Sequence, residues 1–374
     1  MDTNTAEREK LALIKANAFT YLRSDWYDRL VAAFGGAAGV LERSPQELAR
    51  EGGFSAETAA SFLAEASALD AEAELEKSAA AGVSIITRGE PGYPEGLSDL
   101  YDAPLALYVK GCAISGAPKL GMVGTRQVSP YGARTATALG RELSSKGLLI
   151  VSGLARGVDT LCHEAALYSK APTWAVVGTG LGKCYPPENR GLADRIVAGG
   201  GAIISEFPFD KGPMAFHFPR RNRIIAALSF ATLVIEGDIK SGALITAKQA
   251  LELGRDVMAV PGPIDSPRSA GPNRLIKDGA APILSADDVL AAVPLSMSFG
   301  LRPSAGGEKK SAASAPIFGG DAGEALSALG SEEATLDMLT DRLGWSVQRA
   351  AAALFELEAA GAVACANGVY AKRI

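Results

Sequence analysis

Residues 120–153 read LGMVGTRQVSPYGARTATALGRELSSKGLLIVSG, and they contain the pattern that indicates the fold class. Two short runs rich in Leu, Ile and Val, 120–124 and 148–153, end in glycine and flank a segment of helical character. A strand, a helix and a second strand in this order are typical of parallel strands joined by a helix. The stretch therefore predicts an α/β fold.

The same alternation continues along the chain, with further short apolar runs WAVVG, AIISE, TLVIEG and DVMAVPG at 174–178, 202–206, 232–237 and 256–262. We interpret residues 79–298 as an extended Rossmann-like domain, a doubly wound parallel sheet with helices on both faces. This segment holds 22 Lys and Arg against 19 Asp and Glu, whereas the whole chain has a formal charge of -5. The acidic average therefore conceals a mildly basic middle domain.

The flanking segments have a different composition. Residues 1–78 show helical spacing of apolar residues and predict a small helical domain of the SAM or helix-hairpin kind, with 8 basic and 14 acidic residues. Residues 299–326 are rich in Gly, Ser, Ala and Pro and predict a flexible linker. Two helical segments and a hairpin around Asn367-Gly368 then predict a winged helix at 327–374.

Several function classes are disfavoured by the composition. A polar N-terminus and the absence of a long apolar run predict a cytoplasmic protein that does not enter a membrane. Four scattered cysteines and two histidines argue against a zinc site. The run GTGLGK, 178–183, lacks the spacing of a Walker A loop and of a dinucleotide fingerprint, so we expect no ATP, NAD or other cofactor.

Four loops of the middle domain are suited to binding anions. In an open parallel sheet, ligands bind at the carboxyl ends of the strands, where helix N-termini present N–H groups. Small residues admit a phosphate, hydroxyls donate to it, and Arg binds it bidentately. The candidate residues in these loops are Gly124, Thr125, Arg126, Ser152, Gly153, Arg156, Gly157, Arg220, Arg221, Asn222, Arg223, Lys240, Ser241 and Gly242.

The loop before the apolar run of 224–228 is unusual because it carries three arginines at a predicted helix N-terminus. Surface ion pairs are the usual role of a single arginine. Three cations at this end oppose the helix dipole by roughly 0.3–1 kcal/mol each, which indicates an anionic partner, either a ligand or nearby carboxylates. We expect the arginines at the exposed mouth of the cleft, where the four loops converge.

Aromatic residues are interleaved with this basic segment. Exposed rings beside a phosphate-binding groove favour single-stranded nucleic acid, because bases stack on them with about 1–3 kcal/mol each. Since Phe is so often buried, we expect about three of the five rings to belong to the core. The five are Tyr185, Phe207, Phe209, Phe216 and Phe218.

With these loops located, the middle domain resembles the DprA/Smf family of DNA-processing proteins. The resemblance rests on motifs in family order between 119 and 281, among them VGTRQVSPYG, VSGLARGVDTLCHEAAL, GTGLGKCYPPENRGL, FPRRNRIIAALS, SGALITAKQALELGRDVMAVPG and GPNRLIKDGA. The helical and winged-helix flanks also fit the family layout. The resemblance implies a non-enzymatic homodimer that binds and protects single-stranded DNA in natural transformation and helps load the RecA recombinase.

The resemblance also bears on single residues. It implies that Arg126 engages DNA most directly and that the other loop residues line a phosphate pocket, with Lys183 as a further candidate. The predicted winged helix has a poor surface for phosphate, since its second helix carries Arg349 against Glu356 and Glu358. We therefore expect this segment to contact protein or to modulate the dimer.

Two other functions remain open. A nucleoside-monophosphate phosphoribohydrolase has a similar fold and a similar Gly-Thr-Arg loop, and Glu206 or Glu236 could supply acid–base chemistry. Against it, the chain lacks the Pro-Gly-Gly segment and following glutamate of that class and reads GDIKSGALITAKQALE instead. The third possibility is an adaptor that binds only protein and whose pocket is vestigial.

Overall fold

The computed structural model describes residues 3–19, 21–113, 115–294, 297, 320–329, 334–359, 362–366 and 369–372. The chain forms two compact units, Met1–Arg302 and Pro303–Ile374, and each is described by itself. In the described part of the chain, no helix has the length and apolar character needed to cross a membrane.

A nine-stranded sheet forms the centre of the first unit, in the order β1-β2-β6-β5-β4-β3-β7-β8-β9. Neighbouring strands from β6 to β9 are all parallel, which confirms the predicted fold class. The bounds are β1 Val83–Thr87, β2 Ala106–Gly111, β3 Lys119–Val123, β4 Leu149–Ser152, β5 Thr173–Val176, β6 Ala202–Ser205, β7 Ala231–Val234, β8 Asp256–Ala259 and β9 Ala281–Pro282.

The edge of the sheet next to the N-terminal helices differs from the prediction. Strand β1 pairs antiparallel with β2, and β2 pairs antiparallel with β6. Antiparallel edge strands on a mostly parallel sheet are common in folds of this class. The sheet is therefore mixed, and the strand order reverses between β3 and β7.

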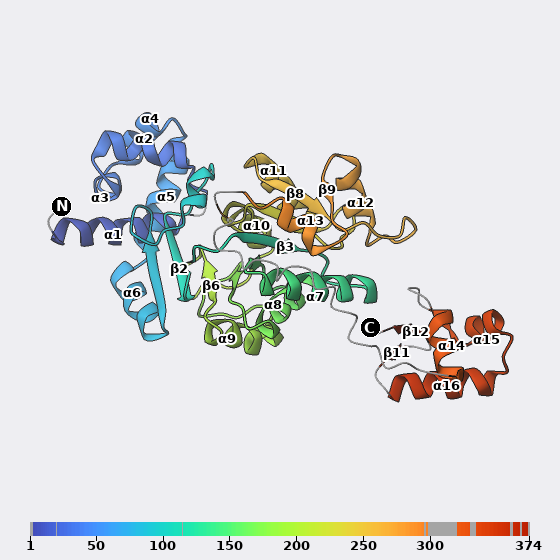
Figure 1. The fold of residues 1–374 in the computed structure, drawn as a ribbon. Helices are drawn as coiled ribbons and strands as arrows, with labels where there is room; N and C mark the ends of the chain where they lie inside the picture. Colours follow the sequence, from blue (N-terminus) through green and yellow to red (C-terminus); the bar gives the residue numbers. More distant parts are fainter. Residues whose placement is uncertain are drawn as a thin grey trace. The chain divides into compact units, whose positions relative to one another are not determined.

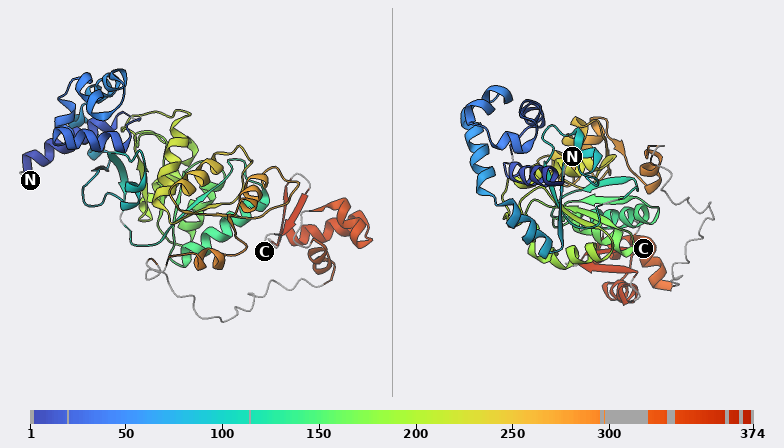
Figure 2. Two further views of the ribbon diagram at one scale, coloured as in Figure 1. Left: turned by 90° about the horizontal axis from the view of Figure 1, so that it is seen from above. Right: turned by 90° about the vertical axis from the view of Figure 1, so that its left-hand side faces the viewer.

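Helices cover both faces of this sheet (Figures 1 and 2). Successive residues of β4 alternate between the two layers, since Ile150 packs with α7, α8 and α13 whereas Leu149 and Val151 pack with α10 and α11. Helices α9 and α12 complete the cover. The bounds are α7 Pro130–Ser145, α8 Val158–Tyr168, α9 Arg190–Ala198, α10 His217–Leu228, α11 Gly242–Glu252, α12 Ala270–Lys277 and α13 Ala286–Ala291.

In the described residues, six helices precede the sheet, in the segment for which the sequence predicts a small helical domain. The first five enclose a core that includes Leu30, Leu48 and Phe62. Asn17, at the end of the first helix, donates to the carbonyl of Glu206 and accepts from the amides of Leu105 and Ala106. The helices are α1 Thr3–Asn17, α2 Ser24–Phe34, α3 Ala37–Leu41, α4 Pro45–Gly52, α5 Ala56–Ala68 and α6 Ala71–Ala80.

Within the residues that the structure describes, the second unit contains three helices and a small antiparallel sheet in the order β10-β12-β11. This arrangement agrees with the predicted winged helix, although the predicted turn at Asn367-Gly368 lies outside the described residues. Its elements are α14 Gly320–Leu329, β10 Ala334–Thr335, α15 Leu336–Leu343, α16 Val347–Ala359, β11 Val363–Ala366 and β12 Val369–Lys372.

Helix α14 corrects the predicted linker, 299–326. Ala322, Ala325 and Leu329 of this helix are buried in the core of the second unit. The Gly- and Ala-rich composition resembled a linker because small residues also permit close packing between helices. The predicted linker therefore extends too far, because α14 begins at Gly320, and its part up to 319 lies outside the described residues.

Candidate functional site

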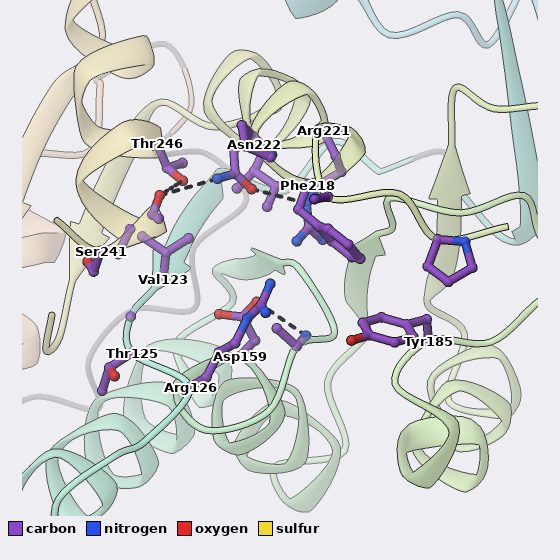
Figure 3. A pocket seen from close by; sticks show the side chains of 18 of the residues that line it. Val123, Thr125, Arg126, Asp159, Tyr185, Phe218, Arg221, Asn222, Ser241 and Thr246 are labelled. Atoms are coloured by element: carbon purple, nitrogen blue, oxygen red, sulfur yellow. Dashed lines mark hydrogen bonds between the residues drawn. The ribbon is translucent and has the colours of Figure 1, made fainter.

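A cavity of about 780 Å³ opens at the carboxyl ends of β3 and β7, where the strand order reverses. Open parallel sheets bind ligands at this position. Figure 3 shows Ser241 and Thr246 on one side, Tyr185 on the other, and Arg126 and Asp159 between them. Of the predicted site residues, those that line it are Gly124, Thr125, Arg126, Arg221, Asn222, Ser241 and Gly242.

Glu236 fixes the Gly-Thr-Arg loop after β3 in place. The backbone carbonyl of Glu236 accepts from the amide of Thr125 at 2.7 Å. The buried carboxylate of Glu236 accepts from the amide and hydroxyl of Ser129, the N-cap of α7. A Cβ on Gly124 would lie 2.5 Å from Val158, so the loop packs too closely for a side chain. Arg126 is exposed, and its guanidinium lies 5.4 Å from the centre of the Phe218 ring.

Arg221 and Asp159 form the floor of the cavity, and both are buried. The Arg221 guanidinium donates to the carbonyls of Gly153 and Val176, and Asp159 accepts from the amides of Gly153 and Ala155. Burial lowers the pKa of Arg221 to about 10, and the negative charge of Asp159 opposes that shift. The guanidinium therefore remains protonated at neutral pH.

The loop after β4, residues 152–157, supports the floor of the cavity, and its residues Ser152, Gly153 and Gly157 do not line the cavity. The Ser152 side chain is fully buried and its hydroxyl donates to the carbonyl of Met122 at 2.6 Å. A Cβ on Gly153 would lie 2.5 Å from both Arg221 and Asp159, and one on Gly157 would lie 2.3 Å from the carbonyl of Thr125. The predicted direct role of Ser152 at a phosphate is therefore wrong, because its side chain is inaccessible.

The N-terminus of α11 forms another wall. Asn222 donates from Nδ2 to the carbonyl of Gly242 at 3.2 Å and thereby ties α10 to α11. The hydroxyl of Ser241 has no hydrogen-bond partner among the described residues, and the residue lines the cavity. Lys240 is exposed just before this helix but does not line the cavity.

Arg220 and Arg223 contradict the prediction that they stand at the exposed mouth of the cleft. Both form ion pairs with Asp102 and Glu206, with N–O distances between 2.6 and 3.1 Å. Arg223 is 5% exposed, and neither arginine lines the cavity. The anionic partners that the sequence required for these two cations are therefore carboxylates of the protein.

Arg156 and Lys183 lie beside the main cavity. Arg156 is exposed and pairs with Glu188, and it borders the narrow space that separates the main cavity from Pro186. Lys183 lines a second, smaller cavity. The structure thus gathers the candidate residues on one edge of the sheet but divides them between a central cavity and its surroundings.

The five aromatic residues also divide. Phe207 is fully buried against His217, and Phe209 is partly buried beside the second cavity, so two rather than three belong to the interior. Phe216 is 44% exposed. Tyr185 and Phe218 line the main cavity with ring centres 5.4 Å apart.

Sequence reasoning missed Asp159. It is the only acidic residue in the first turn of α8, directly after the Ser-Gly-Leu-Ala-Arg-Gly loop. The signal in the sequence is an acidic residue at a predicted helix N-terminus, directly after a loop suited to binding anions. A carboxylate in this position can accept hydrogen bonds from the loop amides and order the loop. Its burial and its proximity to Arg221 follow only from the folded chain.

Comparison with protein families gives two matches. The model of DNA recombination-mediator protein A matches residues 84–294, and the model of the DprA winged helix domain matches residues 309–368. The second match begins before α14, in agreement with the place of that helix in the C-terminal unit.

Individual relatives agree with these matches. Protein Smf of Escherichia coli is 39% identical over 283 residues, which are 75% of this chain and 75% of that protein. DNA processing protein DprA of Bacillus subtilis is 43% identical over 215 residues, which are 57% of this chain and 72% of that protein.

Two solved structures are similar as well. The X-ray structure of DprA from Streptococcus pneumoniae has a TM-score of 0.65 and 35% identity, covering 76% of this chain and 98% of that one. A structure of DprA from Helicobacter pylori, described for its unique single-stranded DNA binding mode, has a TM-score of 0.51 and 30% identity, covering 56% and 94%.

Proposed function

This chain belongs to the DNA recombination-mediator protein A family, also called DprA/Smf, and we propose on that premise that it binds single-stranded DNA in the cavity of Figure 3. The observation that carries the proposal is the position of Arg126. This exposed cation stands at the cavity mouth within reach of the Phe218 ring, so a phosphate and a base can be engaged side by side.

The chemistry of the wall supports binding to the backbone of the strand. Arg126 can pair with a phosphate, while the backbone amides at the start of α11 can donate to its oxygens. Phe218 and Tyr185 present rings on which bases stack regardless of their identity. Such contacts predict strong salt dependence and little sequence preference.

The wider role is proposed from the family. The relative from Helicobacter pylori is described by its single-stranded DNA binding mode, and that from Bacillus subtilis is named a DNA processing protein. We extend this to a cytoplasmic role in natural transformation, in which the protein protects incoming DNA, helps load the RecA recombinase and acts as a homodimer.

The proposed function is binding without catalysis. The two carboxylates that the sequence offered for acid–base chemistry have other partners in the fold. Glu206 pairs with Arg220 and Arg223, and Glu236 holds Ser129. Incubation with nucleoside monophosphates tests the phosphoribohydrolase alternative. Release of free base above background would contradict our proposal and support the phosphoribohydrolase activity.

Titration of labelled oligo-dT across a salt series tests the DNA site. Arg126→Ala should weaken binding at least tenfold and lower the salt slope by about 0.7, the value for one phosphate contact on a single strand. Phe218→Ala should cost about 1–3 kcal/mol of binding free energy and leave the slope nearly unchanged.

Arg134→Ala is the matched control, because Arg134 is an exposed arginine on α7 that does not line the cavity. It should retain the affinity and slope of the parent protein. If Arg126→Ala and Phe218→Ala both bind like this control, the assignment of DNA to the cavity is wrong.

A further inference from the structure

A second cavity, of about 370 Å³, lies beside the first, between α9 and the ends of β5 and β6. Its volume is within the range of about 300–1,000 Å³ that is typical of ligand sites. About half of the wall is apolar, and the apolar residues in it are Ala81, Leu154, Val177, Leu181, Ala193, Val197, Ile203 and Phe209.

Three cations also line this cavity: Lys110, Lys183 and Arg190. Among the described residues, none of the three has a carboxylate within the 4.0 Å of an ion pair. Two neighbouring arginines do form ion pairs, Arg156 with Glu188 and Arg195 with Glu164. With Asp194 as the acidic residue of the lining, the cavity carries an excess of positive charge.

The two cavities are adjacent. Tyr185 lines both of them, and it also lines a narrow space together with Arg126, Arg156 and Phe218. The ring of Tyr185, which lies 5.4 Å from that of Phe218, is therefore the point at which the first cavity adjoins the second.

We infer that the second cavity receives a further nucleotide of the strand held in the first. The inference rests on the proposed function. The apolar wall takes the base, and the three cations take the adjoining phosphates, which is the combination of stacking surface and positive charge that single-stranded DNA requires. Lys183 and Arg190 thus extend the binding path rather than complete the phosphate pocket around Arg126.

Oligo-dT of two lengths tests this inference, about 6 and about 20 nucleotides, which span the usual range of ~4–16 nucleotides for one single-strand site. The double variant Lys183→Ala/Arg190→Ala should bind the short strand with the affinity of the parent. For the long strand it should bind at least tenfold more weakly, with a salt slope lower by about 1.4, the value for two phosphates.

Lys170→Ala/Arg195→Ala is the matched control, because it removes the same two charges from exposed positions outside both cavities. It should leave both affinities unchanged. A loss for the control equal to that of Lys183→Ala/Arg190→Ala would mean that only the net charge matters, and would overturn the inference.

Ala193→Phe tests the cavity itself without changing a charge. A ring at this partly buried position of α9 fills the space proposed for the base. The long strand should then lose affinity at an unchanged salt slope, while the short strand binds as before.

The outcomes separate this inference from the proposed function. If Arg126→Ala abolishes binding but Lys183→Ala/Arg190→Ala and Ala193→Phe both bind the two strands like the parent, only the second subsite is refuted. If no variant, including Arg126→Ala, changes the binding of either strand, the proposed function fails as well. Binding of a mononucleotide that Ala193→Phe removes, with unchanged long-strand affinity, would assign the cavity to a small molecule instead.

Discussion

The guanidinium of Arg221 makes its hydrogen bonds within the protein, although it lies at the floor of the main cavity. It donates to the carbonyls at the ends of β4 and β5, and its charge opposes the rise that burial causes in the pKa of Asp159. A buried carbonyl that loses its donor costs about 1–3 kcal/mol. Arg221 therefore fixes the shape of the cavity, while Arg126 remains available for the ligand.

Arg221→Leu should consequently lower the free energy of unfolding by several kcal/mol, measured by urea denaturation, because two buried carbonyls lose their donor. Arg126→Ala, a change at an exposed position, should stay within about 0.5 kcal/mol of the parent. An Arg221→Leu protein of parental stability that has lost affinity for oligo-dT would instead assign Arg221 to the ligand.

His163 makes stability depend on pH. It is fully buried, its Nδ1 donates to the hydroxyl of Thr173 at 2.9 Å, and its Nε2 has no partner among the described residues. Burial lowers its pKa to about 3, with a smaller effect from the charge of Arg221. The unfolded chain, with a pKa near 6.5, binds the proton first as pH falls.

The stability due to neutral His163 is therefore complete above about pH 6.5 and is lost toward pH 3, by at most about 1.4 kcal/mol for each pH unit. His163→Asn can keep a donor for Thr173 and has no titrating group. Urea denaturation between about pH 7 and 5 should show a shallower decline for this variant than for the parent. Parallel declines would contradict the assignment.

At the residue scale, the sequence could predict which loops meet but not which arginines face the ligand. Arg126 follows a strand directly, so its place at the sheet edge depends only on local order. Arg220 and Arg223 depend on Asp102, which is more than a hundred residues away, and on Glu206. Pairings of this length are not visible in local sequence, so the two arginines could not be distinguished from Arg126.

At the element scale, hydrogen bonds of buried side chains join the N-terminal helices to the sheet. Asn17 of α1 is hydrogen-bonded to Leu105 and Ala106 at the start of β2 and to Glu206 after β6, at 2.8–3.1 Å. Glu74 of α6 accepts from the amide of Phe209 at 2.6 Å. Both contacts hold the segment that leads from β6 toward α10 and the cavity.

Asn17→Ala should therefore destabilise the protein by several kcal/mol, because each buried group left without a partner costs about 1–3 kcal/mol. Urea denaturation measures the change. Asn4→Ala, an exposed position on the same helix, is the control and should change stability by less than about 0.5 kcal/mol. Equal stabilities of the two variants would show that α1 does not depend on this residue.

The elements themselves were predictable because short apolar runs alternate with helical segments. The direction of β1 and β2 was not, since apolar runs of this length fit parallel and antiparallel strands alike. Helix α14 was missed for a different reason. Its alanines fill a closely packed core, in contact with residues such as Leu357 of α16. Without knowledge of these packing partners, a segment rich in alanine has the composition of a linker.

At the scale of the whole molecule, the chain consists of two units with separate cores. The cavity proposed for DNA and its basic neighbours belong entirely to the first unit. In the second unit, the single arginine of α16, Arg349, donates two hydrogen bonds to Asp321. Exposed Phe355 and Val347 on the same helix favour contact with protein over contact with phosphate.

The chain shortened to residues 1–302 should therefore bind oligo-dT with the affinity and salt slope of the full protein, because every cation of the proposed path is retained. Arg349→Ala in the full chain should likewise leave both quantities unchanged. The measurement is the same titration, with circular dichroism to show that the shortened chain is folded. A tenfold loss on shortening, together with a reduced slope for Arg349→Ala, would place part of the DNA contact on the winged helix.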